Sequence, residues 1–287
     1  MSRQMELSLR FLQRQPEAAA RTLEGQPDKI AAAYLQQAPA RLAGPVVARM
    51  LPFYAARCLQ RLPSESVAGI LREAPAASSA MLMRRLPVQF RDEVIEALPR
   101  RIAAAIKLLQ GYPISSVGAW LDALAASLPE DIDAGQAWQR LREEAVDIER
   151  VIPVVDREGA LRGLVRSAAL LTAAEDTPVS QLMEVPAHVL MARSDLLAAR
   201  DDEAAWMGNE AVPVTARDGR YLGVLRHAYL HRGLRAAQEG PAESALTNSL
   251  MELAEAYWMG TSELLEASLG RLLSGRGQSR GDKHDER

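Results

Sequence analysis

Several residue types are scarce in this sequence, and each shortage excludes a class of protein. The 287 residues include one cysteine, Cys58, which excludes an internal disulfide and a cysteine-rich zinc site and fits a reducing compartment. Aromatic residues make up 5% of the chain, so aliphatic side chains and alanine must fill the core. There is no uncharged apolar run of about 18 residues, and the first residues lack the apolar core of a signal peptide. We therefore expect a cytoplasmic protein with no direct membrane span.

Net charge is also small, but it is unevenly distributed along the chain. The formal value of −3 argues against a general nucleic-acid-binding protein. Residues 1–110 carry 16 Lys and Arg against 9 Asp and Glu, whereas residues 111–239 carry 13 against 20. A basic segment and an acidic segment of the same chain attract each other electrostatically. The sequence therefore favours docking of the two parts on each other.

Prolines recur at intervals of 11 to 13 residues in the first hundred residues. Between them, apolar residues such as Val67, Ile70 and Leu71 lie three or four positions apart. A proline ends one helix and suits the first turn of the next, and a helix of about eight residues is not stable alone. The spacing therefore predicts a small solenoid of stacked helices; the alternative is a set of unrelated helical hairpins. The prolines are Pro16, Pro27, Pro39, Pro52, Pro63, Pro75, Pro87 and Pro99.

A strand-turn-strand pattern occurs twice in the second part of the chain. Residues 151–166 read "VIPVVDREGALRGLVR", and residues 211–226 read "AVPVTARDGRYLGVLR". In each, a glycine supplies the positive φ of a tight hairpin turn. A helix precedes each copy, and the second of these is predicted to run from Ser194 with Leu197 among its apolar positions. Each half therefore reads strand, helix, strand, hairpin, strand, helix.

This repeated pattern resembles the CBS domain, which usually occurs as a tandem pair. The proline-punctuated helices followed by "YPISSVGAWL" resemble the cytosolic region of MgtE-type magnesium transporters, in which a superhelical N domain leads into a CBS pair. Leu121 stands where the family's junction has methionine, and the resemblance covers about residues 5–235. The residues that match the junction are Tyr112, Pro113, Ser116 and Gly118.

The resemblance implies an all-α superhelical N-terminal domain, then an α/β (α+β) tandem CBS pair, then a C-terminal amphipathic helix. The C-terminal amphipathic helix is also indicated by leucines spaced three and four residues apart. The residues after this helix have the composition of a disordered tail. The predicted boundaries are 1–110 for the helical domain, 111–183 and 184–239 for the two CBS motifs, 240–274 for the amphipathic helix and 275–287 for the tail.

The resemblance also implies a regulatory function. In the transporters, Mg²⁺ bridges carboxylates of two acidic cytosolic domains, whereas the first domain here is basic and no membrane channel is present. We expect a soluble regulatory module that binds a small ligand or cation, with Mg²⁺ favoured, and signals through domain rearrangement or dimerisation. Because the basic domain can contact carboxylates directly through arginine, Mg²⁺ is expected to be a weaker modulator of docking or none.

If a metal site is retained, the best candidate is the acidic run of the second half. Mg²⁺ prefers hard oxygen ligands, which adjacent carboxylates provide. The alternative is a solvated helix face, which carries such runs routinely. The candidate metal ligands are Asp195, Asp201, Asp202 and Glu203.

The resemblance places a ligand-binding cleft between the two CBS halves, where such pairs commonly bind adenine nucleotides. Nucleotide-binding versions have Ser or Thr after the second strand and, three residues on, an Asp for the ribose; Ala169 and Tyr229 stand at the Asp positions here. An adenine-nucleotide sensor is therefore the second hypothesis. The two arginines of the pattern either face a phosphate or begin a helix and point into water. The candidate cleft residues are Pro153, Arg166, Pro213 and Arg226.

No constellation of catalytic residues is present, so we expect that the protein is not an enzyme. His227 and His231 lie four apart as zinc-binding histidines do, but without a third ligand they indicate an exposed polar face. We expect a homodimer through the CBS pair and the C-terminal helix, and a membrane transporter or another protein as partner. A third hypothesis is a ligand-free helical scaffold for a partner protein.

Overall fold

The computed structural model describes residues 3–143 and 150–238. Residues Met1–Arg235 form one compact unit. The predicted amphipathic helix and tail, residues 240–287, lie outside the described residues. Among the described residues, none of the helices has both the length and the hydropathy needed to cross a membrane.

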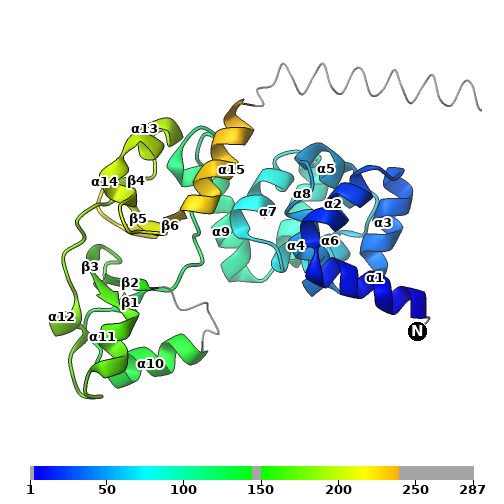
Figure 1. The fold of residues 1–287 in the computed structure, drawn as a ribbon. Coiled ribbons are helices and arrows are strands. Elements are labelled where there is room, and N and C mark those ends of the chain that lie inside the picture. Colours follow the sequence, from blue (N-terminus) through cyan, green and yellow to red (C-terminus); the bar gives the residue numbers. More distant parts are fainter. Residues whose placement is uncertain (1–2, 144–149, 239–287) are drawn as a thin grey trace, which may run out of the picture. The chain divides into compact units, whose positions relative to one another are not determined.

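The first part of the chain is entirely helical (Figure 1). A proline stands at the N-cap or at the first position of every helix from α2 to α9. Proline suits these positions because its fixed φ agrees with the extended backbone of an N-cap and because a helix start needs no N–H donor. The prediction of short proline-punctuated helices is therefore confirmed. The helices are α1 (Arg3–Arg14), α2 (Pro16–Glu24), α3 (Asp28–Gln37), α4 (Ala40–Val47), α5 (Pro52–Leu59), α6 (Ser64–Arg72), α7 (Ala76–Met83), α8 (Val88–Ala97) and α9 (Arg100–Gln110).

From α2 onward, each helix packs on the one two places further along the chain. Helices α2, α4, α6 and α8 form one row, and α3, α5, α7 and α9 form the other. Every residue of α7 is buried, including Ser78 and Ser79. The stack buries a continuous core that no single eight-residue helix could form. This is the arrangement of a small solenoid.

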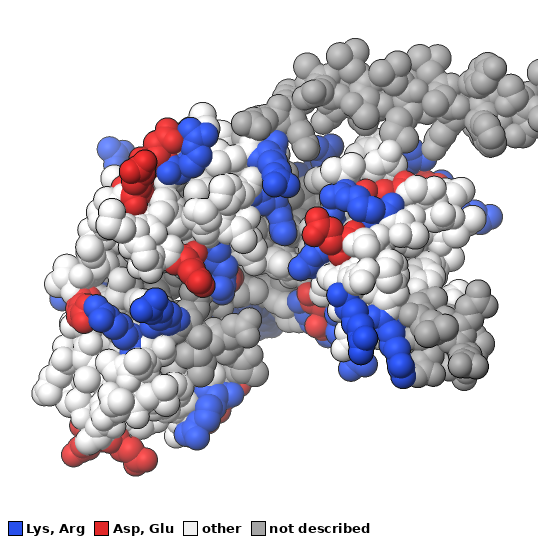
Figure 2. All heavy atoms as spheres, in the orientation of Figure 1, with Lys and Arg blue, Asp and Glu red and all other residues white. Residues whose placement is uncertain are grey.

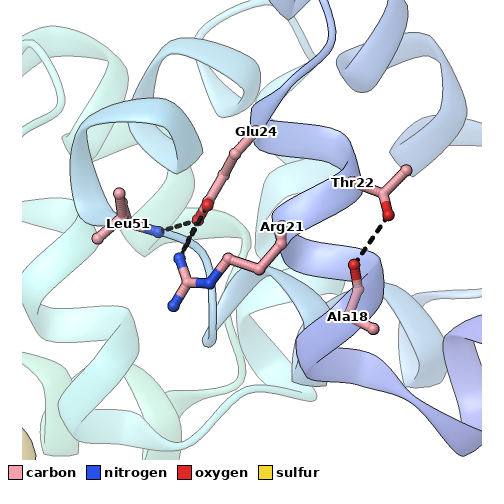
Figure 3. A network of polar contacts seen from close by, with 5 residues as sticks. All are labelled: Ala18, Arg21, Thr22, Glu24 and Leu51. Carbon is pink, nitrogen blue, oxygen red and sulfur yellow. Dashed lines mark hydrogen bonds and ion pairs between the residues drawn. The ribbon is translucent and has the colours of Figure 1, made fainter.

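A carboxylate joins the end of α2 to the start of α5 (Figure 3). Glu24 accepts hydrogen bonds from the Arg21 guanidinium at 2.8 and 2.9 Å and from the backbone N–H of Leu51, the N-cap of α5. A negative charge is favourable at a helix N-terminus, where N–H groups lack intrahelical partners. Glu24 therefore supplies the cap that the side chains of Leu51 and Pro52 cannot provide.

The single cysteine is a core residue, as the sequence indicated. Cys58 is 2% exposed in α5, and burial together with the nearby Asp28 carboxylate raises the pKa of its thiol to about 11. Asp28 itself pairs with Arg61 at 2.8 Å and with Arg57 at 3.5 Å. Because the thiolate is the reactive form, Cys58 is inert at neutral pH.

Gly44 of α4 lies directly against the C-terminal end of α6. A Cβ at this residue would lie 2.8 Å from Glu73 and from the Ile70 carbonyl oxygen. Gly44→Ala should therefore force the helices apart and lower the free energy of unfolding by about 1–3 kcal/mol. Gly69 in α6 is the matched control, because a Cβ there would meet only Ala40, at 4.0 Å.

Gly69→Ala should instead raise the free energy of unfolding by about 0.5–1 kcal/mol, since alanine favours the helix. Urea denaturation of both variants measures the difference. If both substitutions changed the free energy of unfolding by the same amount and in the same direction, the claim that α6 leaves no room for a Cβ at Gly44 would be contradicted.

The second part of the chain consists of two α/β halves with the same topology (Figure 1). In each sheet a short strand pairs in parallel with the middle strand, which pairs antiparallel with the last. Both antiparallel ladders have a register shift at the corresponding position. The predicted repeat is confirmed, and with it the fold class of the described residues, a helical domain followed by a CBS pair. The first sheet contains β1 (Leu128–Pro129), β2 (Val151–Val155) and β3 (Leu161–Arg166), and the second contains β4 (Leu190–Met191), β5 (Ala211–Thr215) and β6 (Tyr221–Arg226).

The two hairpin turns bind each other reciprocally. Gly159 and Gly219 have φ values of 80° and 85°, as the tight turns require. The N–H of Leu161 donates to the Gly219 carbonyl at 3.2 Å, and the N–H of Tyr221 donates to the Gly159 carbonyl at 2.9 Å. Since each half makes the same contact on the other, a pseudo-twofold axis relates the two hairpins.

Short helices complete the two halves. Asp133 begins α10 by accepting a hydrogen bond from the Gln136 N–H at 2.8 Å, and α10 packs its apolar side on the core of the first half. The elements outside the sheets are the 3-10 helix η1 (Val117–Ala119) and helices α10 (Ala134–Glu143), α11 (Ser167–Thr172), α12 (Val179–Leu182), α13 (Leu196–Asp201), α14 (Glu203–Trp206) and α15 (His227–Gln238).

The helix predicted from Ser194 differs from the structure in two respects. It is divided at Asp202, which ends α13 and caps α14 by accepting a hydrogen bond from the Ala205 N–H at 3.2 Å. Leu197 is 49% exposed, whereas Leu196 is buried. The break at Asp202 changes the helical phase, so a single continuous spacing does not describe the buried side.

Candidate functional site

A cavity of about 740 Å³ is lined by both halves. Residues of β2, β3, β5 and β6 contribute to it, together with residues of the loops that follow α12 and α14. Its volume lies in the range of small-molecule binding sites. We therefore take this cavity, called the cleft below, as the candidate site.

All four residues that the sequence predicts for the cleft line it. Pro153 lies in β2 opposite Leu164, and Pro213 lies at the equivalent position of β5. Arg166 and Arg226 end the outer strands β3 and β6. The structure thus brings the four residues together, while their role in binding stays a prediction.

Each cleft arginine forms an ion pair with a carboxylate on the linker that precedes the opposite half. Arg166 Nη2 lies 3.1 Å from Glu184 Oε2. Arg226 donates to Asp122 Oδ2 from Nε at 3.2 Å and from Nη2 at 3.1 Å. The side chains of the first pair are 64% and 63% exposed, against 33% and 19% for the second. The sequence did not predict either carboxylate. Arg166, the exposed N-cap of α11, agrees with the alternative of an arginine that begins a helix and points into water, whereas Arg226 is turned toward Asp122.

The two carboxylates occupy equivalent places on the sheets. The backbone of Glu184 exchanges two hydrogen bonds of 2.8 Å with Leu164 of β3. Asp122 exchanges two with Val224 of β6, at 2.7 and 3.2 Å. A second, weaker repeat in the sequence marks these linkers, "VGAWLD" at residues 117–122 and "VSQLME" at residues 179–184. A search for repeats outside the hairpins would have found them.

Opposite charges stand at another pair of equivalent positions in the cleft. Arg150 precedes β2, and Glu210 precedes β5 at the corresponding place. The carbonyl of Arg150 accepts from the Ser167 N–H, and that of Glu210 accepts from the His227 N–H, both at 3.0 Å. The backbone is therefore symmetric while the charge is not, and no periodicity in the sequence indicates this asymmetry.

An aromatic row borders the second half of the cleft. Trp206, a lining residue, lies with its ring centroid 5.0 Å from that of His227, which lies 4.5 Å from that of His231. The Trp206 indole donates to the Ala199 carbonyl at 2.6 Å, which fixes its orientation. Both histidines are exposed, so the prediction of an exposed polar face agrees with the structure.

The positions of the missing ribose carboxylate lie in the helices that follow the outer strands. Ala169 is in α11, and Tyr229 is in α15, where the Arg232 guanidinium stands 5.9 Å from the centre of its ring. Neither side chain can accept a hydrogen bond from two ribose hydroxyls as a carboxylate does. A nucleotide in this cleft would need other contacts to its sugar.

The candidate metal ligands of the second half are mostly engaged within their own helices. Asp195 caps α13 by accepting from the Leu197 N–H at 2.7 Å, and Asp202 caps α14. A hydrogen bond from Arg200 at 2.8 Å lowers the pKa of Asp201. In residues 3–143 and 150–238, no group of three or more His, Cys, Asp or Glu side chains is placed to hold a metal ion. The structure therefore does not bring these carboxylates together with Glu203 as a ligand set.

A hydrogen bond to a hydroxyl connects the helical domain to the second half. Arg232 of α15 donates to the Ser78 hydroxyl of α7 at 2.8 Å, and burial lowers the pKa of this guanidinium. Arg84 of the helical domain donates to the carbonyls of Leu109, Gln110 and Tyr112, which anchors the start of the linker.

Basic and acidic side chains lie side by side on the face shown in Figure 2. Docking through Arg–carboxylate contacts stays a prediction.

Two segments of the chain match models of known protein families. Residues 14–115 match the MgtE intracellular N domain, and residues 125–176 match the CBS domain. The chain is similar to the solved cytosolic domain of the Mg²⁺ channel MgtE in complex with ATP, with 20% identity and a TM-score of 0.69 over 78% of this chain and 92% of that one. It is also similar to the soluble part of a magnesium transporter, with 18% identity and a TM-score of 0.57 over 82% and 98% of the two chains. None of the curated proteins matches it.

Proposed function

We infer that this chain, which combines an MgtE intracellular N domain with a CBS pair as the cytosolic region of MgtE transporters does, is a regulatory module. Its ligand site is the cleft between the CBS halves. Binding there changes the relation of the two halves, and the change passes to a second copy of the chain or to a partner protein such as a membrane transporter.

The cleft is the observation that supports this function. It has the volume of a small-molecule site and is lined by three arginines, Arg150, Arg166 and Arg226. Elements from both halves line it, so a bound molecule would contact both and stabilise one arrangement of them. A ligand shifts a conformational equilibrium only through such differential contacts.

An adenine nucleotide is the ligand class that the cleft favours. The similar MgtE cytosolic domain was solved in complex with ATP, and the arginines and the Trp206 ring of this cleft can interact with phosphate and base. The absence of a carboxylate at residues 169 and 229 removes the usual sugar contact, so weak binding is expected. Mg²⁺ is the alternative that the resemblance to magnesium transporters implies.

Calorimetric titration of the full chain with AMP, ATP and MgCl₂ tests this function. We expect saturable heat with the nucleotides. Ala187 is exposed and lines the cleft, so Ala187→Trp should fill it and weaken nucleotide binding by about tenfold or more, which corresponds to about 1.4 kcal/mol. The control is Ala97→Trp, at an exposed position of α8, which should bind as the wild type does.

Two results would contradict the proposal. If neither nucleotide nor Mg²⁺ gives saturable heat, the module is not a small-molecule sensor, and the scaffold hypothesis is favoured. If Ala187→Trp binds nucleotide as tightly as Ala97→Trp does, the ligand does not occupy the cleft. A signal with MgCl₂ alone would favour cation sensing in place of nucleotide binding.

A further inference from the structure

The two cleft arginines are equivalent in sequence and in backbone position, but their environments differ. Both end an outer strand, and both pair with a carboxylate that lies beside that strand. The difference lies in how firmly each carboxylate is held and how much of each pair is exposed to water. A ligand that enters the cleft therefore does not meet two equal guanidinium groups.

Arg226 is held by a well-fixed partner. Asp122 Oδ2 accepts from two nitrogens of Arg226, while Asp122 Oδ1 accepts from the Leu124 N–H at 3.1 Å. The backbone of Asp122 is bound on both sides by Val224, and its side chain is 19% exposed. Withdrawal of Arg226 would leave a poorly solvated carboxylate unpaired, which is costly. Arg226 therefore serves to hold the linker on β6.

Arg166 is paired weakly. One contact of 3.1 Å joins it to Glu184, and both side chains are more than 60% exposed. Exposed pairs of this kind contribute little because water and salt screen them. Both partners line the cleft, so an anion with more charge than one carboxylate can replace Glu184 at little cost.

The residues beside the two cleft arginines also differ in charge, and this difference too favours anion binding near Arg166. Arg150 stands on the side of the cleft that Arg166 occupies, at the start of β2, whose first residue pairs with Arg166. The equivalent position beside Arg226 holds Glu210. One side of the cleft is thus lined by two arginines, and the other side by one arginine and an extra acidic residue. An anionic group is attracted to the first side and repelled from the second.

We propose that the cleft takes a phosphorylated small molecule whose phosphate binds Arg166 and Arg150 and displaces Glu184, while Arg226 stays paired with Asp122 as a positioning residue. The proposal rests on the function inferred above. Because guanidinium and phosphate form paired hydrogen bonds, the phosphate group fixes the orientation of the ligand. Glu184 then acts as an internal competitor that keeps the site closed to weaker anions.

The test compares matched substitutions in the full chain, titrated with AMP, adenosine and inorganic phosphate. Arg166→Gln should weaken AMP binding by about tenfold or more, since a charge-assisted hydrogen bond is lost, with little change in melting temperature. Arg226→Gln should show the reverse pattern, a clear loss of melting temperature with a smaller loss of affinity. Arg217→Gln, at an exposed residue of the second hairpin turn, controls for the change in net charge.

Glu184→Gln is the decisive variant because it predicts a gain. It removes the competitor, so AMP and inorganic phosphate should both bind more tightly, by roughly two- to fivefold, in line with the weakness of an exposed pair. A gain in affinity cannot result from misfolding. Adenosine, which lacks the phosphate, should bind weakly and should respond to neither Arg166→Gln nor Glu184→Gln.

The inference would be overturned if adenosine bound as tightly as AMP, if Arg166→Gln left AMP binding intact, or if Glu184→Gln weakened it. In each of these cases the wild-type chain still binds a ligand, so the regulatory function stands. If the wild-type chain bound no nucleotide, the proposed use of the cleft would fail and the inference with it. Enhanced binding of phosphate alone by Glu184→Gln would identify a free anion as the ligand.

Discussion

Gly223→Ala is expected to destabilise the protein by roughly 2–6 kcal/mol, because it combines backbone strain with overpacking. Gly223 has a φ of 143°, which residues with a Cβ rarely adopt. An added Cβ would overlap the Asp122 carbonyl oxygen and lie 2.8 Å from Leu121 Cδ1. Alanine would therefore separate the linker from β6 and break the backbone pairing that positions Asp122 beside Arg226.

The repeat supplies the control for this prediction. Gly163 is the equivalent residue of β3, where the three atoms nearest to an added Cβ would all belong to the Met183 side chain, at 2.9 to 3.0 Å. Gly163→Ala should cost less than half as much as Gly223→Ala, since methionine can move aside. Guanidinium denaturation followed by circular dichroism measures both. Equal losses of unfolding free energy in the two variants would contradict the close contact between Asp122 and Gly223.

Trp120→Ala is expected to lower the free energy of unfolding by about 3–5 kcal/mol, the usual cost of removing a large buried ring. Trp120 is 2% exposed, and its indole donates to the Ile114 carbonyl at 2.7 Å. Gly233 of α15 lies against the ring, so that a Cβ there would stand 2.9 Å from Trp120 Cγ. The ring thus joins the start of the linker to the helix that follows β6.

Trp120→Phe separates the hydrogen bond from the packing. It keeps an aromatic ring but leaves the Ile114 carbonyl without its donor, so a loss of about 1–3 kcal/mol is expected. The order of stability should therefore be wild type, Trp120→Phe, Trp120→Ala, measured by thermal and chemical denaturation. If Trp120→Ala lost less than 1 kcal/mol, a threshold set by the typical effect of a point substitution, the linker would not depend on this residue.

The helical domain was predictable because its signals are local. A proline constrains its own φ and removes its own donor, so the regularly spaced prolines mark the starts of short helices, while Pro45 lies inside α4. The paired hairpins were predictable for the same reason, since a glycine in a tight turn and an alternating strand need only near neighbours. Local signals were less reliable where a side chain interrupts an element. Asp202 divides α13 from α14 by accepting a backbone hydrogen bond, which apolar spacing alone does not indicate.

The cleft was only partly predictable. The sequence indicated Pro153, Arg166, Pro213 and Arg226, since they belong to the repeat itself, and the structure places all four on the cleft. It did not indicate that Asp122 and Glu184 pair with the arginines, because these residues belong to linkers whose repeat is weak. Arg226 and Asp122 lie 104 positions apart, and only the folded chain brings them together.

The sequence by itself determined the order of parts, the starts of the short helices and the existence of two matching halves. These properties depend on the torsional limits of proline and glycine and on side-chain periodicity, which act over a few residues. The tertiary structure alone decided that the equivalent arginines differ, because the strength of an ion pair depends on its burial and on what else holds the carboxylate. The Asp122 carboxylate also accepts a hydrogen bond from the Leu124 N–H and is 19% exposed, whereas the Glu184 side chain is 63% exposed, and this difference separates a structural arginine from one that can exchange its partner.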